Sequence, residues 1–348
     1  MSNKTITAEI VLPGSNLDKT ISFFSKKLGF QLESIFPANN PKEAIINGHG
    51  LRIRLKYGKN IHPGIISITG KKSQPQIAPN GTKILFQEYN RNYVLPEAKQ
   101  SIEISHLDKA KWKIGRAGME YRDLIPNHYG GRFIASHIRI PKAGPVEDYV
   151  HFHKIRFQMI YCYKGSAKLV YENQGKPFIF ESGDCVLQPP EIRHRVLENS
   201  DQFEVIEITS PAIHMTHTDP TFELPNIVNS KKRSFHGQNF LLHKTENANW
   251  DNGENKDYKI QDLGIKTATN NLAQVKVLKS LGFKTPLTRK YDTEFHFIFL
   301  LTGTMKILIQ ENYSCNLASG DSITIPSGKE FSIIQCPTGS QFLEILFV

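Results

Sequence analysis

Residues 144–165 read GPVEDYVHFHKIRFQMIYCYKG, and residues 183–200 read GDCVLQPPEIRHRVLENS. Each stretch begins at a glycine and contains short runs of β-branched, aromatic and aliphatic residues, which is typical of strands separated by turns. His151 and His153 are two residues apart, so their side chains share one face of a strand. Gln158 follows in the next strand-like run, and His194 lies in the second stretch. Three imidazoles and an amide oxygen suit Fe(II), Mn(II), Ni(II), Cu(II) or Zn(II), and ligand type alone does not select among these metals.

An internal repeat extends outward from these two stretches. Related residues recur at an offset of 137 to 139 positions along the chain. The pairs are Trp112 and Trp250, Gly144 and Gly282, Gly165 and Gly303, Gly183 and Gly320, Pro189 and Pro326, and Gln202-Phe203 with Gln341-Phe342. A nearly fixed offset indicates two copies of one structural unit, which we place at residues 112–210 and 250–348.

Both copies are expected to be β-structures, because their apolar runs are short and are separated by Gly, Pro and Asn. Strands are expected at residues 132–140, 158–163, 168–171, 178–180, 185–188 and 203–208, and in the second copy at residues 274–278, 296–301, 305–309, 322–325 and 342–347. Many short strands at regular spacing favour a sandwich or a jelly-roll barrel.

The first stretch resembles the first signature motif of the cupin superfamily, G-x5-H-x-H-x(3,4)-E-x6-G. The chain matches this motif with Gly144, His151, His153 and Gly165. It differs in having six residues before His151, and in having Gln158 where the superfamily has glutamate.

The second stretch resembles the second cupin motif, G-x5-P-x-G-x2-H-x3-N. Gly183, Pro189 and His194 match it, whereas Glu191 takes the Gly position and Glu198 the Asn position, one residue before Asn199. The resemblance implies a mainly β protein with two cupin jelly-roll barrels, which is a bicupin.

The resemblance further implies that His151, His153, Gln158 and His194 hold a divalent transition metal, with Fe(II) favoured. Gln158 brings no charge where the superfamily has a carboxylate. The centre would therefore stay near +2 and attract an anionic ligand such as a carboxylate or enolate. If the strand alternates regularly from Gln158, Arg156 also faces inward and would clamp a carboxylate as a catalytic residue. Alternatively, Arg156 lies at the rim of the barrel.

The second copy lacks this ligand set. By the repeat offsets, Arg289, Tyr291, His296 and Phe331 take the four ligand positions. One imidazole does not make a metal site, so the second copy is expected to be structural and His296 to be a core histidine. His214 and His217, in the linker at residues 211–249, are expected in a solvated loop.

Residues 1–95 have a different pattern. A strand-like run at residues 5–12 precedes Ser15, a predicted helix cap, and then apolar residues at helical spacing that end at Gly29. Strand-like runs follow at residues 31–36, 51–57, 64–69 and 82–87, and residues 96–111 form a connector to the first copy.

This module resembles one βαβββ unit of the glyoxalase/bleomycin-resistance (vicinal oxygen chelate) family. The resemblance rests on Phe23-Phe24, on Leu28-Gly29-Phe30 and on the closing run at residues 80–86. That family builds its metal cup from two such units. The resemblance therefore implies that this single unit dimerises or binds rather than catalyses, with Glu9 near the position of the family's first-strand ligand.

Composition excludes several classes of protein. With 348 residues, 39% hydrophobic and 22% charged, the chain is too apolar to be disordered, and its longest apolar runs fall short of the ~20 residues of a membrane span. The net charge is +10, but the basic residues are scattered, with the densest cluster at residues 231–233. This distribution favours a solvated surface over a nucleic-acid partner.

The four cysteines, Cys162, Cys185, Cys315 and Cys336, are too few for a disulfide scaffold and are expected to be buried thiols. No apolar leader precedes the first strand-like run, so a cytoplasmic location is expected.

The function that the resemblance implies is a metal-dependent oxidation. Bicupins with a His-rich ferrous site include dioxygenases that cleave rings and C–C bonds. We therefore expect a dioxygenase-type oxidoreductase that acts on a small anionic substrate, aromatic or enolisable. Two alternatives stay open: a metal-dependent isomerase, lyase or hydrolase, and a non-enzymatic small-molecule sensor. Neither nucleic acid nor membrane is expected as a partner, and a homodimer is compatible with the sequence.

Overall fold

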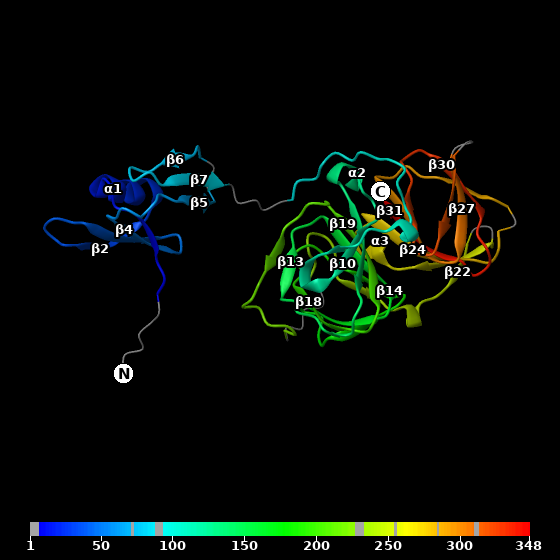
Figure 1. Cartoon of the computed structure of the whole chain (residues 1–348). Coiled ribbons are helices and arrows are strands. Elements are labelled where there is room, and N and C mark those ends of the chain that lie inside the picture. Colours follow the sequence, from blue (N-terminus) through cyan, green and yellow to red (C-terminus); the bar gives the residue numbers. More distant parts are fainter. Residues whose placement is uncertain are drawn as a thin grey trace. The chain divides into compact units, whose positions relative to one another are not determined.

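The computed structural model describes residues 7–70, 73–87, 93–226, 233–253, 256–283, 285–309 and 313–348. The chain divides into two compact units, residues 1–91 and 92–348, and Figure 1 follows the chain through both. The predicted strand at residues 5–12 and the basic cluster at residues 231–233 fall partly outside the described residues. No helix in the described part of the chain has the length and apolar character needed to span a bilayer.

The first unit has the predicted order of one strand, one helix and further strands. Its elements are β1 (Ile10–Pro13), α1 (Leu17–Leu28), β2 (Gln31–Phe36), β3 (Glu43–Gly48), β4 (Leu51–Lys56), β5 (Ile65–Thr69), β6 (Gln76–Ile77) and β7 (Lys83–Gln87). They form one sheet in the order β1-β4-β3-β2 and another in the order β5-β7-β6. Strands β3 and β6 were not predicted from the sequence.

Helix α1 is amphipathic and ends as predicted. Phe24 and Leu28 are buried in the core of this unit, and Gly29 ends the helix in the left-handed conformation, at φ 78°, which glycine adopts without steric cost. The predicted cap at Ser15 is wrong. The helix begins at Leu17 after Asn16, and no side chain caps it.

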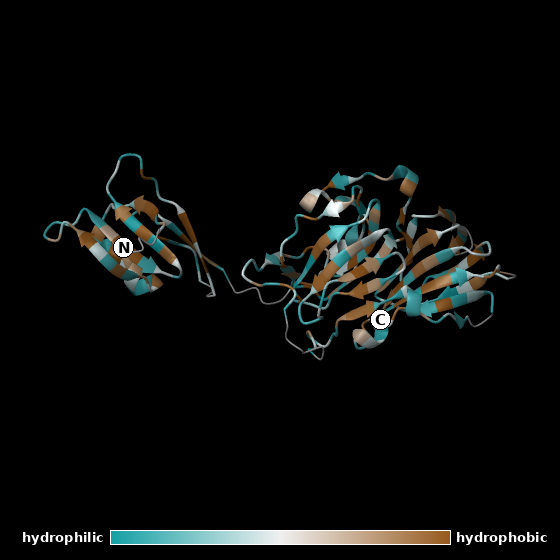
Figure 2. Ribbon diagram, turned by 90° about the horizontal axis from the view of Figure 1, so that it is seen from below, coloured by the Kyte–Doolittle hydropathy of each residue, from teal (hydrophilic) through white to brown (hydrophobic). Residues whose placement is uncertain are grey.

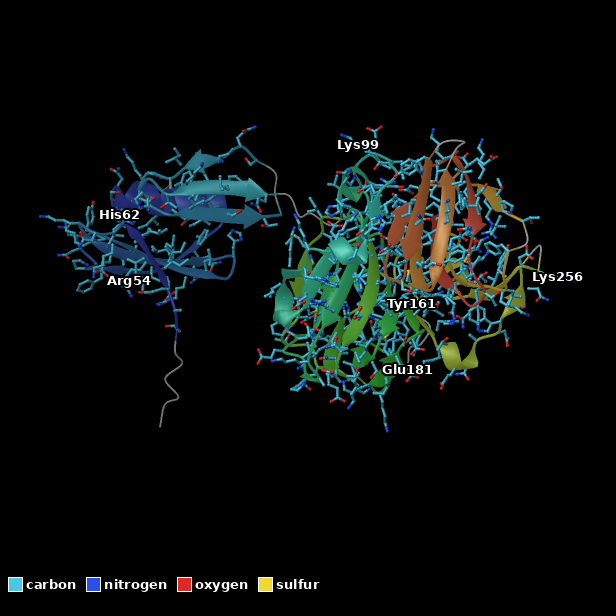
Figure 3. The ribbon with its side chains drawn as sticks, turned by 45° about the vertical axis from the view of Figure 1, so that its right-hand side comes forward. Arg54, His62, Lys99, Tyr161, Glu181 and Lys256 are labelled. Atoms are coloured by element: carbon cyan, nitrogen blue, oxygen red, sulfur yellow. The ribbon has the colours of Figure 1, made fainter. Side chains whose placement is uncertain are left out.

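The face of the first sheet away from α1 carries a network of ion pairs. Glu9 accepts hydrogen bonds from both Arg52 and Arg54, and Arg54 lies on this outer face in Figure 3. A carboxylate shared by two guanidinium groups has no free oxygen to offer a metal, so the position expected for a first-strand ligand is a structural one.

The second unit consists of two jelly-roll barrels, each made of a longer and a shorter sheet. The first barrel has the order β21 (Leu241–His243), β17 (Cys185–Leu187), β14 (Phe157–Lys164), β19 (Phe203–Ser210), β11 (Ile134–Ile140), β10 (Glu120–Asp123), β9 (Lys113–Ile114) in one sheet. Its other sheet has the order β16 (Phe178–Glu181), β15 (Ser166–Tyr171), β18 (His194–Asn199), β13 (His151–His153), β20 (Thr216–Thr218), and β12 (Gly144–Pro145) pairs with β18. The short helix α2 (His128–Gly131) precedes β11.

The second barrel repeats this arrangement. Its longer sheet has the order β22 (Asp251–Asn252), β23 (Tyr258–Asp262), β24 (Ala273–Ser280), β31 (Gln341–Phe347), β26 (Phe295–Thr302), β29 (Ser322–Thr324), β8 (Ile104–Ser105), and its shorter sheet has the order β25 (Leu287–Lys290), β30 (Glu330–Gln335), β27 (Thr304–Ile309), β28 (Tyr313–Ala318). The short helix α3 (Ile265–Ala268) precedes β24. The mainly β fold and the two jelly-roll barrels expected from the sequence are confirmed.

A short strand from outside each copy completes the longer sheet of each barrel. β8 precedes the first copy in the chain but pairs with β29 of the second barrel, whereas β21 precedes the second copy but pairs with β17 of the first. The predicted connector at residues 96–111 therefore supplies β8 to the second barrel. The predicted linker at residues 211–249 supplies β21 to the first barrel.

Two buried aspartates at equivalent positions of the two copies anchor the segments that follow β8 and β21. Asp321 accepts hydrogen bonds from the N–H groups of Leu107 (2.8 Å) and Ala318 (3.0 Å), and the His106 ring lies 2.9 Å from its second oxygen. Asp184 anchors the segment after β21, because it accepts hydrogen bonds from the N–H of Thr245 (3.0 Å) and from the Lys244 ammonium (2.6 Å).

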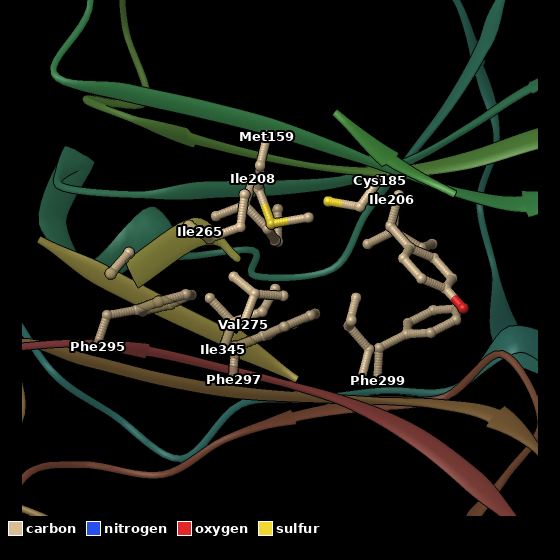
Figure 4. Packing of buried hydrophobic residues seen from close by; sticks show 14 of the residues in the cluster. Met159, Cys185, Ile206, Ile208, Ile265, Val275, Phe295, Phe297, Phe299 and Ile345 are labelled. Carbon is tan, nitrogen blue, oxygen red and sulfur yellow. The ribbon is translucent and has the colours of Figure 1, made fainter. Parts of the chain in front are cut away.

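A continuous apolar core joins the two barrels. Figure 4 shows Met159 and Ile208 of the first barrel facing Phe295 and Phe297 of the second, and Tyr161 lies between the barrels in Figure 3. Along many strands in Figure 2, hydrophobic and hydrophilic residues alternate, as expected for strands with one buried face. The cysteines are free thiols, and Cys162, Cys185 and Cys336 are buried.

Replacing Asp321 with alanine should lower the free energy of unfolding of the second unit by about 2–4 kcal/mol, because two N–H groups and an imidazole lose their buried partner. Tryptophan fluorescence during urea denaturation measures this unit alone, since Trp112 and Trp250 are the only tryptophans in the chain. The exposed Asp108 lies in the same segment, so Asp108→Ala is the matched control and should change stability by less than about 0.5 kcal/mol. Equal effects of the two substitutions would contradict the anchoring role.

Candidate metal centre

Three imidazoles converge between two neighbouring strands of the first barrel. His151 and His153 lie at the two ends of β13, and His194 begins β18 directly opposite His151. Their ligand nitrogens lie within 4.8 Å of one another, and the three side chains are buried. Among the residues that the structure describes, these three histidines are the one group of three or more His, Cys, Asp or Glu side chains close enough to hold a metal ion.

Hydrogen bonds fix the orientation of the rings. His151 Nδ1 donates to the carbonyl of Tyr149 (2.8 Å), and His194 Nδ1 donates to the carbonyl of Ile192 (2.9 Å). His153 Nδ1 lies 3.2 Å from the hydroxyl of Thr216. With Nδ1 occupied as a donor in His151 and His194, the Nε2 lone pairs of these rings are the ones that would bind a metal, and a metal at His151 would displace Arg116 Nη2, which lies 3.3 Å from that nitrogen.

Burial keeps these imidazoles neutral. It lowers the pKa of His151, lowers the pKa of His194 well below its usual value, and lowers the pKa of His153 to about 2, and the neighbouring imidazoles lower the last two further. A neutral imidazole is the form that binds metal, so at neutral pH this site needs no loss of protons before binding.

Gln158 supplies an oxygen to the same cavity. Its Nε2 donates to Glu207 Oε2 at 3.2 Å, while its buried Oε1 has no hydrogen-bond partner. Burial raises the pKa of Glu207. A buried amide oxygen without a partner, beside three neutral imidazoles, is a donor set that a divalent transition metal would complete.

These groups open onto a cavity of about 290 Å³ inside the first barrel. Its walls are mostly apolar and aromatic, and include Ile138, Leu169, Tyr171, Phe180, Val196 and Phe203. The polar side chains at the cavity, besides the predicted ligands, include Arg116, Tyr121, Gln188, Glu207 and His214.

Arg156 does not line this cavity, which corrects the inward orientation considered in the sequence analysis. It precedes the first residue of β14, and its Nη1 lies 2.8 Å from both carboxylate oxygens of Glu294 in the second copy. The guanidinium is therefore paired between the barrels and cannot clamp an anion at the histidines.

Arg116 places a cation beside the histidines, and Arg195 also lines the cavity. Its Nη2 lies 3.3 Å from His151 Nε2, and its Nη1 pairs with Asp148, a buried carboxylate that also accepts the N–H of Val196 at 3.1 Å. No periodic signal in the sequence points to Arg116, because it lies in a Gly-Arg-Ala-Gly turn 35 residues before His151.

His214 also reaches the cavity, so its placement in a solvated loop was wrong. Its ring centre lies 5.3 Å from that of His153, and its Nδ1 donates to the carbonyl of Pro211 (3.1 Å). His217 does not line the cavity; its ring stacks on Phe152 at 5.1 Å.

The departures from the second motif have local structural reasons. Glu191 adopts the left-handed conformation (φ 65°), as Gly328 does at the equivalent position of the second copy (φ 70°). Near the end of β18 the pairing register shifts. The extra residue places Asn199, rather than Glu198, where its amide donates to the carbonyls of Lys142 and Ser200 at 2.9 and 2.8 Å.

The equivalent region of the second barrel is filled by side chains. Glu344 lies 3.2 Å from His296 Nε2 and 3.4 Å from Arg289 Nη1. The rings of Tyr291 and Phe331 each lie 5.2 Å from that of His296. His296 is thus a buried core histidine, as expected, and the second copy is packed where the first is hollow.

Comparisons with known proteins support the fold. No family model and no curated protein sequence matches the chain. Among solved structures, protein Ylba from E. coli is similar at 9% identity and a TM-score of 0.52, over 73% of this chain and 93% of that one. A point mutant of Bacillus subtilis oxalate decarboxylase is similar at 11% identity and a TM-score of 0.51, over 74% of this chain and 78% of that one. A further structure of that enzyme, which has Mn(II) centres, matches at 12% identity and a TM-score of 0.51. These likenesses show a cupin-type fold.

Lowering the pH should destabilise the metal-free protein through the buried histidines. The unfolded chain protonates His153 below pH about 6.5, whereas the folded chain, in which the pKa is about 2, excludes that proton. The free energy of unfolding should therefore fall as the pH drops from about 6.5 to 5, with His153 contributing a slope of about 1.4 kcal/mol per pH unit.

Urea denaturation at several pH values, after treatment with a chelator, measures this slope. His153→Gln should reduce the slope by about 1.4 kcal/mol per pH unit, which corresponds to one proton. His236→Gln, at an exposed histidine, should leave the slope unchanged. Identical slopes for wild type and His153→Gln would contradict the expectation.

Proposed function

We propose that the second unit is a metal-dependent oxidoreductase of the dioxygenase type that acts on a small anionic substrate, aromatic or enolisable. One observation carries the proposal: three neutral imidazoles and the unpartnered Oε1 of Gln158 face a mostly apolar cavity that holds a guanidinium. Such a constellation is expected of a ligand site rather than of a packed core.

His151, His153, Gln158 and His194 would hold the metal. Fe(II) is the favoured ion, in keeping with the resemblance to ferrous bicupins, and Mn(II) is the next candidate because oxalate decarboxylase, a structural neighbour, has Mn(II) centres. When bound, such a metal supplies Lewis acidity and, for Fe(II), redox chemistry with O₂. Glu207 contributes by accepting from Gln158 Nε2, which keeps the amide oxygen free.

Arg116 would bind the anionic group of the substrate. Asp148 holds the guanidinium beside His151, so a carboxylate that meets Arg116 also lies next to the imidazoles. The aromatic walls formed by residues such as Tyr171, Phe180 and Phe203 suit a planar apolar group and exclude water.

A metal-dependent lyase is the second candidate function. Its support is the fold shared with a decarboxylase, which at 11–12% identity concerns architecture alone. The same anion-binding site would also serve an isomerase, a hydrolase or a non-enzymatic sensor. Measurement of oxygen uptake and product formation distinguishes these alternatives.

The first unit would serve binding or dimerisation. The order β1-α1-β2-β3-β4, with β1 parallel to β4, suits a βαβββ module of the glyoxalase type. Its similarity to that family, the homodimer and the cytoplasmic location stay predictions.

Protein purified without a metal-affinity tag should contain about one transition-metal ion per chain. The double variant His151→Ala/His153→Ala should contain none, because two of the three imidazoles are lost. Elemental analysis measures both. The matched control is His217→Ala/His236→Ala, which removes two histidines outside the cavity and should retain the metal. A metal-free wild type after anaerobic reconstitution would overturn the proposal.

Oxygen uptake should accompany turnover when the metal-loaded protein is screened with small aromatic and enolisable carboxylates. An oxygen electrode, combined with chromatography of the products, measures both quantities. Product formation without oxygen uptake would favour the lyase or another non-oxidative reaction, and ligand binding without any product would favour a sensor.

Arg116→Gln should raise the KM for the substrate found in that screen by about 10- to 100-fold, because a charge-assisted hydrogen bond to the anion is lost. Arg156→Gln removes a guanidinium of the same size that pairs with Glu294 outside the cavity, and should leave KM unchanged. Steady-state kinetics of both variants tests the assignment, and a larger effect of Arg156→Gln would reverse it.

A further inference from the structure

A second amide faces the cavity and takes no part in the metal site. Gln188 follows β17, and its N–H donates to the carbonyl of Gln158 at 2.9 Å, so the two glutamines are cross-strand neighbours. Gln188 is 1% exposed, it lines the cavity, and neither its Oε1 nor its Nε2 has a hydrogen-bond partner. A buried amide with both polar atoms unpaired is costly and rare in a folded protein.

The second barrel shows that the fold does not require an amide at this position. Ile325 is the equivalent residue there: its N–H donates to the carbonyl of His296, as that of Gln188 donates to the carbonyl of Gln158. Ile325 is 2% exposed and belongs to the apolar core of its barrel. An aliphatic side chain therefore fits this backbone position, and the polar atoms of Gln188 serve something other than folding.

Several neighbouring polar groups of the cavity are already engaged, although Arg195 also lines the cavity and its buried Nε has no hydrogen-bond partner. Gln158 Nε2 is used by Glu207, Gln158 Oε1 is assigned to the metal, and Arg116 is held by Asp148 near His151. Gln188 is left with two donor hydrogens and an acceptor oxygen in a mostly apolar cavity. A ligand group that can both accept and donate a hydrogen bond would satisfy it, and a hydroxyl is the simplest substituent of a small organic acid that does both.

We propose that Gln188 determines substrate specificity: its side-chain amide hydrogen-bonds a hydroxyl group of the substrate, so that the cavity selects hydroxylated carboxylates over their unsubstituted counterparts. This proposal rests on the proposed function, because it requires that the cavity binds a small carboxylate. A site built around a buried polar group discriminates strongly against ligands that leave this group unpaired, because the cost of burying it is then not offset.

The test uses pairs of carboxylates that differ by one hydroxyl group. Isothermal titration calorimetry of the metal-loaded full chain compares 2-, 3- and 4-hydroxybenzoate with benzoate, and lactate with propionate. The wild type should bind at least one hydroxylated acid at least about tenfold more tightly than its partner, and Gln188→Ile should bring that ratio to about one. Gln188→Leu provides a second variant in case the β-branched side chain is not accommodated.

A melting curve separates recognition from a structural role. If the amide is unpaired in the ligand-free protein, Gln188→Ile and Gln188→Leu should melt at the wild-type temperature or above it. The reciprocal control, Ile325→Gln, should melt at a lower temperature and leave the hydroxyl preference intact.

Three results would overturn the proposal: no hydroxyl preference in the wild type, a preference that survives both Gln188 variants, or a lower melting temperature in both variants. Failure of the proposed function would look different. A metal-loaded chain that consumes no oxygen, yet loses its hydroxyl preference on Gln188→Ile, would retain the specificity assignment while losing the oxidative one.

Discussion

A strand from outside its own copy is the constraint on which the second barrel depends. β8 precedes the first copy in the chain yet pairs with β29, whereas the strands of the first barrel, from β9 to β21, follow one another along the chain. Asp321 and Asp184 then fix the segments that follow β8 and β21 through buried hydrogen bonds. The second copy keeps its glycine and proline skeleton after losing three of the four ligand positions, and its barrel supplies one wall of the core that it shares with the first.

The chemistry of the first barrel follows from a balance of burial and charge. Burial of three imidazoles next to a guanidinium favours their neutral forms, since each additional positive charge would raise the energy of the others. Asp148 compensates Arg116 locally, so the cavity combines neutral metal donors with a guanidinium whose charge is largely balanced until an anion arrives. In the second barrel, Glu344 is the equivalent of Glu207 by strand register. It pairs with both Arg289 and His296, and the polar groups satisfy one another without a ligand.

The sequence predicted the elements that depend on local pattern. The repeat offset and many of the strands of both copies follow from periodicity and spacing, which act over a few residues or between two aligned copies. The convergence of His194 with His151 and His153 was implied by the resemblance to the two cupin motifs. The features that it missed depend on contacts between distant segments. Arg116 and His214 reach the cavity from turns without periodicity, and the pairing of β8 and β21 could not be anticipated because short strands of two or three residues carry no pattern of their own. The error at Arg156 has the same origin, since strand alternation was extended one residue beyond the start of β14, to a side chain that pairs with a carboxylate in the other copy.

The pairing of Arg156 with Glu294 has a consequence for how the two halves of the chain relate. These residues are 138 positions apart, which is the repeat offset, so they are the same position in the two copies and meet across the internal twofold relation. In an assembly of two identical barrels this position would face itself, and two arginines or two glutamates would repel each other. The attraction exists only between copies that differ. At this position, therefore, the contact between the barrels has the character of a heterodimer interface held within one polypeptide.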